Sequence, residues 1–128
     1  MNDRIKMCVH GKECIKDANE FFNEKYLGCY AEETGMDCVF SLNCFTEMPK
    51  DIFTEDAHDV DEILAFLGGN PNDISDFDAE IDVFLDGEKV TVTEPAFFSI
   101  PAGMKHSLKY RSLNKPVIMW AFQMQHKN

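Results

Sequence analysis

Short apolar segments separated by turn residues follow one another from about residue 36 onward, and they restrict the fold of this chain more than any other feature. The clearest turn signal is Asp86-Gly87, a dipeptide that favours a two-residue β-hairpin turn. It lies between 81–85 and 89–93, two segments rich in strand-forming residues. The sequence therefore predicts an antiparallel hairpin over these residues.

Further strands are expected wherever a short apolar run lies between residues that break regular structure. Pro49, Pro101 and Pro116 supply such breaks, and the Gly-, Asn- and Asp-rich stretch 68–78 has the composition of a loop. Short strands at this spacing are typical of an antiparallel sandwich or barrel. The strands expected besides the hairpin are 39–42, 58–67, 97–100, 107–111 and 117–122.

The N-terminal part of the chain has a different pattern. Asp17 to Tyr26 fits a short helix, with Asp17 as a candidate N-cap and Gly28 as the residue that stops it. We therefore expect a helical or extended segment over residues 1–44, which packs on a barrel or on a partner subunit. The barrel itself is expected over residues 45–128.

Composition and charge exclude several classes of partner. The chain has 128 residues, 45% of them hydrophobic, which is enough for one domain with a substantial core. Its formal net charge of −11 argues against nucleic acid and anionic membranes, because phosphate-bearing partners need a basic face. No apolar run approaches the roughly 18 residues of a membrane span, and the first residues lack the apolar stretch of a secretory signal. We expect a soluble, cytoplasmic protein.

The cysteines do not indicate a disulfide framework. They are five in number and all lie in the first part of the chain: Cys8, Cys14, Cys29, Cys38 and Cys44. The count is odd, and no C-x-x-C spacing occurs. Cys8, His10 and Cys14 can be drawn as part of a zinc site, but their spacing fits no established zinc pattern. We interpret the cysteines as small, often buried apolar residues.

Two histidines and a glutamate carry the clearest chemical signal. If a regular strand begins at His58, then Glu62 lies on the same strand face, because side chains two and four residues apart point to one side. His106 follows a Pro-x-Gly turn, where the chain re-enters the sheet and can direct its imidazole to the same end. Two imidazoles and a carboxylate form a mixed N/O site suited to Fe(II), Mn, Ni, Co or Zn, with positions open for a ligand.

The first of these segments resembles a signature motif of the cupin superfamily, whose members are small jelly-roll β-barrels. That motif reads G-x5-H-x-H-x3,4-E-x6-G, and its second histidine, its glutamate and its closing glycine match His58, Glu62 and Gly69. The likeness covers about residues 45–125, and it is greatest to uncharacterised cupins of one domain.

The second segment resembles the other cupin motif, G-x5-P-x-G-x2-H-x3-N. Its central proline, glycine and histidine match Pro101, Gly103 and His106. The resemblance implies an all-β fold of the cupin jelly-roll type, with a divalent transition metal bound inside the barrel. It also implies pairing of subunits, so that we expect a homodimer.

The departures from the motifs affect the expected metal site. Asp56 takes the place of the first histidine, Pro95 that of the leading glycine of the second motif, and Tyr110 that of its final asparagine. Cupins usually present three histidines and one glutamate, whereas two histidines and one glutamate remain here. Asp56 or Glu80 can supply the missing ligand. The predicted metal site comprises His58, Glu62, Glu80 and His106, with Asp56 as the alternative to Glu80.

Three classes of function follow from this interpretation. The first is a metal-dependent enzyme that acts on a small organic substrate as an oxidoreductase (dioxygenase), isomerase, decarboxylase or lyase, with an unbound carboxylate as general base. The second is a non-catalytic binding or sensory module that holds a small molecule through the metal. The third is a structural role in an oligomer. A barrel without metal, in which the polar residues hydrogen-bond to one another, is the alternative to all metal-dependent functions. No paired-arginine clamp or similar constellation identifies a substrate.

Overall fold

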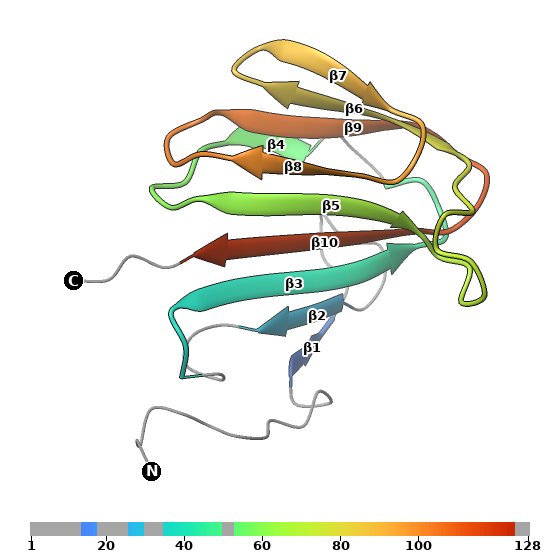
Figure 1. Ribbon diagram of the computed structural model, residues 1–128, viewed down its shortest axis with the longest axis horizontal. Coiled ribbons are helices and arrows are strands. Elements are labelled where there is room, and N and C mark those ends of the chain that lie inside the picture. The colour runs from blue at the N-terminus through green and yellow to red at the C-terminus, as the bar shows by residue number, and fades with distance from the viewer. Residues whose placement is uncertain (1–13, 18–25, 30–34, 50–52, 125–128) are drawn as a thin grey trace.

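The computed structural model describes residues 14–17, 26–29, 35–49 and 53–124. These residues form ten strands in two antiparallel sheets that enclose a shared core (Figure 1). The all-β jelly-roll architecture expected from the sequence is confirmed. No helix in the described part of the chain is long and apolar enough to cross a membrane.

The larger sheet has six strands in the order β1-β2-β3-β10-β5-β8, and the smaller has four in the order β4-β9-β6-β7. In chain order the strands are β1 (Ile15–Lys16), β2 (Tyr26–Cys29), β3 (Cys38–Phe45), β4 (Phe53–Asp56), β5 (Glu62–Gly68), β6 (Ala79–Leu85), β7 (Glu88–Val92), β8 (Ala96–Ile100), β9 (His106–Leu113) and β10 (Val117–Met124). Strands β3, β6, β7, β8, β9 and β10 contain most of the residues at which the sequence predicts strands. The sequence analysis did not predict β4.

The Asp86-Gly87 hairpin is confirmed. Asp86 and Gly87 have φ angles of 49° and 85°, the left-handed values that both central residues of a type I′ turn require. Leu85 therefore pairs with Glu88 directly, and the register of β6 against β7 follows from this turn.

The strand expected to begin at His58 begins instead at Glu62. The reason lies in the hydrogen bonds of residues 58–61. The Asp61 carbonyl accepts one from the Met124 N–H of β10 at 3.0 Å, but two others go to the distant turn between β8 and β9. The His58 carbonyl accepts a hydrogen bond from the Gly103 N–H at 2.7 Å, and the Asp61 side chain accepts one from the Ala102 N–H at 2.9 Å. This connection therefore forms a loop fastened to the β8–β9 turn.

The N-terminal expectations are tested only in part. Most of the predicted helix, residues 18–25, lies outside the described residues. Tyr26, its expected last residue, lies in β2 together with Gly28, the expected stop, so that part of the prediction is wrong. The boundary placed between residues 44 and 45 falls inside β3, which pairs with both β2 and β10. Cys8 and His10, of the alternative zinc site, also lie outside the described residues, and Cys14 and Cys38 are free thiols.

The core fills the space between the inner faces of the two sheets. Phe45, Phe66 and Tyr110 form an aromatic cluster there, with ring centroids 5.0 Å apart for Phe45 and Tyr110 and 6.5 Å apart for Phe66 and Tyr110. All three side chains are buried, which is worth about 1.5–3 kcal/mol for each large apolar side chain. This packed interior gives β5 and β9 fixed positions, and both strands begin at the same end of the barrel (Figure 1).

Candidate metal centre

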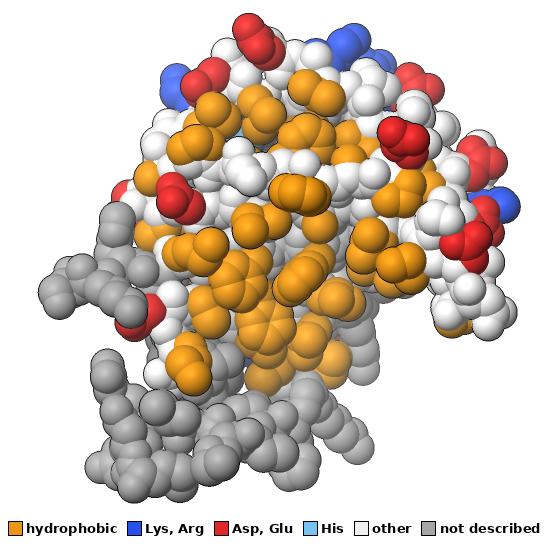
Figure 2. Space-filling view, viewed as in Figure 1, with side chains coloured by type: hydrophobic (Ala, Val, Ile, Leu, Met, Phe, Trp, Pro, Cys, Tyr) orange, Lys and Arg blue, Asp and Glu red, His pale blue; other side chains and the backbone are white. Residues whose placement is uncertain are grey.

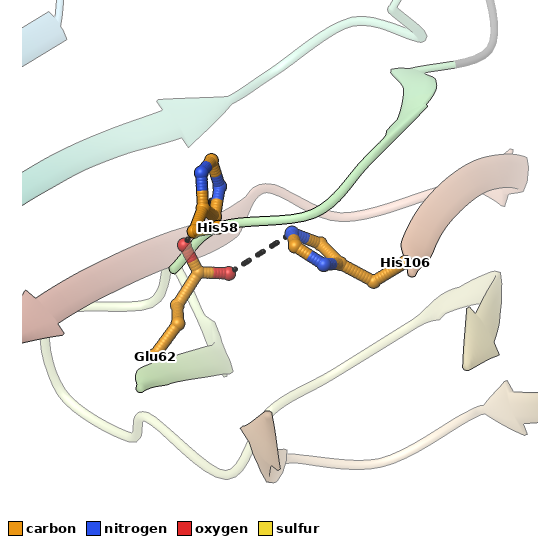
Figure 3. A group of neighbouring side chains, drawn as sticks. All are labelled: His58, Glu62 and His106. Atoms are coloured by element: carbon orange, nitrogen blue, oxygen red, sulfur yellow. Dashed lines mark ion pairs between the residues drawn. The ribbon is translucent and has the colours of Figure 1, made fainter. Parts of the chain in front are cut away.

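Three of the four predicted metal ligands meet at that end of the barrel. His58, Glu62 and His106 each offer a ligand atom, and these atoms all lie within 4.8 Å of one another (Figure 3). His58 comes from the β4–β5 loop, Glu62 is the first residue of β5, and His106 is the first residue of β9. The structure thus brings together residues that are 48 positions apart in the sequence, from His58 to His106.

The Pro101–Met104 turn places His106. Gly103 has a φ of 85°, a left-handed conformation that glycine adopts without strain. The turn is closed by a hydrogen bond from the Met104 N–H to the Pro101 carbonyl at 3.1 Å. Because Gly103 also donates to the His58 carbonyl, the turn that carries one histidine holds the backbone of the other.

The hydrogen bonding of His106 fixes which ring nitrogen is available. Its Nδ1 lies 3.1 Å from the Met104 carbonyl oxygen. A carbonyl oxygen can only accept, so Nδ1 must carry a proton. In the neutral ring the lone pair is then on Nε2, which lies 3.4 Å from Glu62 Oε2. Two electron-rich atoms face each other at that distance only if a positive charge compensates them, supplied by a second ring proton or by a metal ion.

Glu62 is the most buried member of the group, with 6% of its side chain exposed. A buried carboxylate is costly unless it has partners. Its Oε1 accepts a hydrogen bond from the Gln123 side-chain amide at 2.8 Å, and Gln123 is the residue opposite Glu62 on β10. The sequence analysis did not identify Gln123. The one available signal was a polar side chain at the end of an apolar strand.

His58 lies at the outer side of the group. Its side chain is 28% exposed, and its Nε2 lies 3.8 Å from Glu62 Oε1. Its ring lies 5.2 Å from that of His106, measured between centroids. Asp56, with 63% of its side chain exposed, approaches the same Nε2 at 3.7 Å. The site therefore opens to solvent on the side of His58 and Asp56.

Glu80, the fourth predicted ligand, lies outside this group. It is exposed on β6, whereas its neighbour Ile81 is buried in the core. Side chains alternate between the two faces of a strand, so Glu80 points away from the barrel interior. Of the two candidates for the position of the missing histidine, Asp56 is the one in contact with the site.

Gly69, the last residue of the first motif, lies at the other end of β5 and has a packing role. A Cβ atom at Gly69 would lie 2.7 Å from the Cβ of Pro116 and 3.1 Å from Cys44 Sγ. The Gly69 N–H also donates to the Pro116 carbonyl at 2.8 Å. The absence of a side chain therefore lets the β9–β10 connection pack closely against the end of β5.

The donor set fits a divalent transition metal. Two imidazoles and one carboxylate match the facial arrangement that leaves coordination positions open for a ligand or water. The Met104 carbonyl and the Gln123 amide hold the rings and the carboxylate in place from behind, as outer partners of metal ligands do. The described residues thus contain the ligand atoms, the orienting groups and an open side.

Comparisons by sequence and by structure gave different results. No family model and no curated protein matches the sequence. Among solved structures, an RmlC-like cupin from Shewanella frigidimarina matches with a TM-score of 0.62 and 13% identity, over 96% of this chain and 94% of that one. A cupin protein from Bacteroides fragilis matches with a TM-score of 0.57 and 17% identity, over 100% of this chain and 89% of that one.

A third solved structure, KdgF from Halomonas, matches with a TM-score of 0.56 and 15% identity, over 93% of both chains. These likenesses extend over nearly whole chains at low identity, so that they show the fold. The chain has the cupin fold, as the two motifs in its sequence suggest.

Proposed function

We propose that this chain, which has a cupin fold, binds a divalent transition metal through His58, Glu62 and His106. The bound metal would in turn bind or activate a small organic substrate. Fe(II), Mn, Ni, Co and Zn all suit the donor set. The observation that carries the proposal is the approach of His106 Nε2 to Glu62 Oε2 at 3.4 Å while Nδ1 is engaged by the Met104 carbonyl. A metal ion bound between them would be coordinated by both electron-rich atoms, His106 Nε2 and Glu62 Oε2.

Each neighbouring group has a role in this proposal. Gln123 holds the Glu62 carboxylate, and Met104 fixes the tautomer of His106. A bound divalent ion would act here as a Lewis acid or as an oxygen-activating centre. Asp56, exposed beside His58, is the carboxylate placed to exchange a proton with a substrate at the open side of the site.

Elemental analysis of untagged protein, purified without added metal, tests the proposal. We expect about one transition metal ion per chain, because three side-chain ligands are already assembled. His106→Ala and Glu62→Gln should lose the metal. Glu80→Gln, which removes an exposed carboxylate on the outer face of β6, is the matched control and should retain it. A wild-type chain that holds no metal and takes up none on reconstitution would contradict the proposal and would favour a second ring proton.

The orienting role of Gln123 gives a finer test. Gln123→Met keeps the length of the side chain but removes the donor to Glu62 Oε1. Loss of an outer partner of this kind typically lowers metal affinity about 10–100-fold. Competition with a chelator measures this change. Unchanged affinity would mean that Gln123 does not position the carboxylate.

Turnover distinguishes the enzyme from a non-catalytic binding or sensory module. The Co(II)-loaded protein reports ligand binding through its visible spectrum, and oxygen uptake or product analysis with small organic acids reports chemistry. Binding with turnover supports the enzyme. Spectral changes without any product would favour the binding module instead.

A further inference from the structure

The usual alternation of side chains is reversed in the middle of β3. Phe40 and Leu42 point outward there, whereas Ser41 and Asn43 point into the barrel. Figure 2 shows hydrophobic side chains gathered across the middle of the outer side of this sheet. A sheet that covers a core normally places apolar residues inside and polar ones outside. Because the fold alone does not favour the reversal, the inner polar residues of β3 are candidates for a function.

Asn43 is buried, and its side-chain oxygen has no partner. It lies opposite Met119 of β10, a core residue, and is 4% exposed. Within the described part of the chain, its Oδ1 is a buried side-chain atom without any hydrogen bond. Burial of an amide oxygen without a hydrogen bond lowers the stability of the fold. Native proteins rarely keep such an atom unless a ligand or a water molecule satisfies it.

The Tyr110 hydroxyl also has only a weak partner. It donates to Met119 Sδ at 4.0 Å, and a thioether sulfur is a weak acceptor. Burial raises the pKa of Tyr110, so its hydroxyl keeps its proton and remains a donor. Met119 therefore lies beside two buried polar groups, an acceptor on Asn43 and a donor on Tyr110.

These two groups lie deeper in the barrel than the candidate metal centre. The Met119 row includes Phe66 on β5, four residues after Glu62. Tyr110 likewise lies four residues after His106 on β9. Four residues of a strand span about 13 Å. A molecule that reaches from the metal to both polar groups is therefore elongated and lies along the barrel.

Small side chains line one wall between the two levels. Ala121 on β10 lies opposite Ser41 on β3 and Leu64 on β5. It packs against the core from a strand inside the sheet, yet both Ala121 and Ser41 are only half-buried. Inward-pointing side chains keep such exposure where the interior beside them is not filled. The barrel thus has room for a largely apolar chain between the metal centre and Asn43.

We propose that Asn43 and Tyr110 bind the far end of the substrate whose other end binds the metal, and that this far end is an uncharged hydroxyl or carboxamide. Such a group donates to Asn43 Oδ1 and accepts from the Tyr110 hydroxyl. A charged end would be costly, because Phe45 and Phe66 make the surroundings apolar. The inference rests on the proposed function and adds the class of substrate: an elongated molecule with a metal-binding head, an apolar middle and an uncharged polar tail.

Asn43→Leu tests whether the Asn43 oxygen is kept for a ligand. Leucine has the branched shape of asparagine without its polar atoms, so the ligand-free protein should become more stable. Its urea midpoint should rise by at least about 0.3 M. Thr91→Val is the matched control, because the Thr91 hydroxyl donates to Asp82 and its loss should lower the midpoint. An unchanged or lower midpoint for Asn43→Leu would show that the protein or a buried water satisfies the oxygen, and would overturn the proposal.

Calorimetric titration with a probe series tests the class of substrate. The probes are ω-hydroxy carboxylic acids of increasing chain length, each paired with the linear acid in which a methyl group replaces the hydroxyl. At one chain length, the wild type should bind the hydroxy acid at least about 10-fold more tightly than its paired acid. Asn43→Leu should lose this preference, and Tyr110→Phe repeats the titration if Asn43→Leu does not fold.

The corresponding dicarboxylic acids test the charge of the tail. Each should bind more weakly than the hydroxy acid of the same carbon chain, because its second carboxylate would be buried among apolar side chains. Tighter binding of a dicarboxylic acid, or no preference for a hydroxyl at any chain length, would overturn the proposal.

Elemental analysis of the same samples separates this inference from the proposed function. Asn43→Leu should hold as much metal as the wild type, because Asn43 lies about four strand residues, or about 13 Å, from the level of Glu62. Metal-loaded protein without a preference for the hydroxyl would overturn this inference alone. A wild type that binds no metal would contradict the proposed function, and the urea midpoint of Asn43→Leu would still decide the role of Asn43.

Discussion

The two sheets have similar inner faces and opposite outer faces. The six-stranded sheet presents Leu42, Phe97 and Trp120 on its outer side. The four-stranded sheet presents charged side chains on its outer side, among them Asp82, which lies opposite Lys109. Side chains that point inward and outward alternate along each strand, and the inward ones of both sheets form the shared core. The inner faces therefore do not distinguish the two sheets. Their outer faces do, because one carries charged side chains and the other carries exposed apolar ones.

The two outer faces differ in how their side chains are covered. Asp82 is only 2% exposed although it points away from the core. It is covered by Arg111, whose Nε donates to Oδ2 at 2.5 Å, and by Thr91, whose hydroxyl donates to Oδ1 at 2.9 Å. The four-stranded sheet therefore completes its outer face within one chain. On the outer face of the six-stranded sheet, the exposed side chains of Leu42, Phe97 and Trp120 are apolar, and among the described residues of β3, β5, β8 and β10 no ion pair of this kind occurs.

The largest effect is expected from Arg111→Ala. It removes the Arg111 donor from the buried Asp82 carboxylate and leaves the Thr91 hydroxyl as a donor to Oδ1, which should lower the free energy of unfolding by about 2–4 kcal/mol. The lower part of this range allows for the half-exposed Arg111 side chain. Urea unfolding at fixed protein concentration measures it, with Lys109→Ala as control.

A variant on the other sheet sharpens the contrast between the faces. Phe97→Asp should change the free energy of unfolding little, because the Phe97 side chain is 70% exposed on the outer face of the six-stranded sheet. If Phe97→Asp lowers the free energy of unfolding as much as Arg111→Ala does, the two outer faces do not differ in the way that their side chains indicate.

Acid should act on the outer face of the four-stranded sheet alone. The hydrogen bond from Arg111 holds the pKa of Asp82 below its usual value. A carboxyl group whose pKa is lowered by folding stabilises the fold above its unfolded pKa, near 3.9, and loses that contribution as the pH falls through the lower folded value. The outward-facing residues of β3, β5, β8 and β10 in the described part of the chain carry no charge, so they should not contribute to this loss.

Urea unfolding of the wild type and of Asp82→Asn at several pH values below 5 tests this expectation. The wild type should lose more stability than the variant on acidification. Equal loss of stability in acid in both proteins would show that the Asp82 ion pair does not stabilise the sheet.

Local signals in the sequence were sufficient for much of the fold. Asp86-Gly87 fixes a hairpin through the backbone preferences of two adjacent residues, and the structure has that hairpin. The apolar run 117–122 does not alternate, which is typical of a strand covered on both sides. In the structure this segment is β10, which pairs with β3 on one side and with β5 on the other.

Distant contacts explain what the sequence could not predict. His58 was expected in a strand, but its carbonyl bonds to Gly103, 45 residues later, and no local pattern encodes that contact. Gln123 lies 61 residues from Glu62, and its role depends on the pairing of β5 with β10. The motif spacing identified the three residues that meet in the structure. Neither motif includes Glu80, and the sequence did not show that its side chain would point out of the barrel.

Added salt should have the smallest effect, and it should act on the charged outer face. Raising NaCl from about 0.1 to 1 M shortens the screening length from about 10 to 3 Å. A double-mutant cycle between Asp82 and Arg111 should show a smaller coupling energy at 1 M, since the Arg111 side chain is half exposed. Salt does not weaken apolar contacts, so the apolar outer face of the other sheet should not respond in this direction. A coupling energy that is equal at both salt concentrations would mean that the Asp82–Arg111 pair is shielded from solvent, and the charged face would then resemble a core contact more than a surface exposed to water.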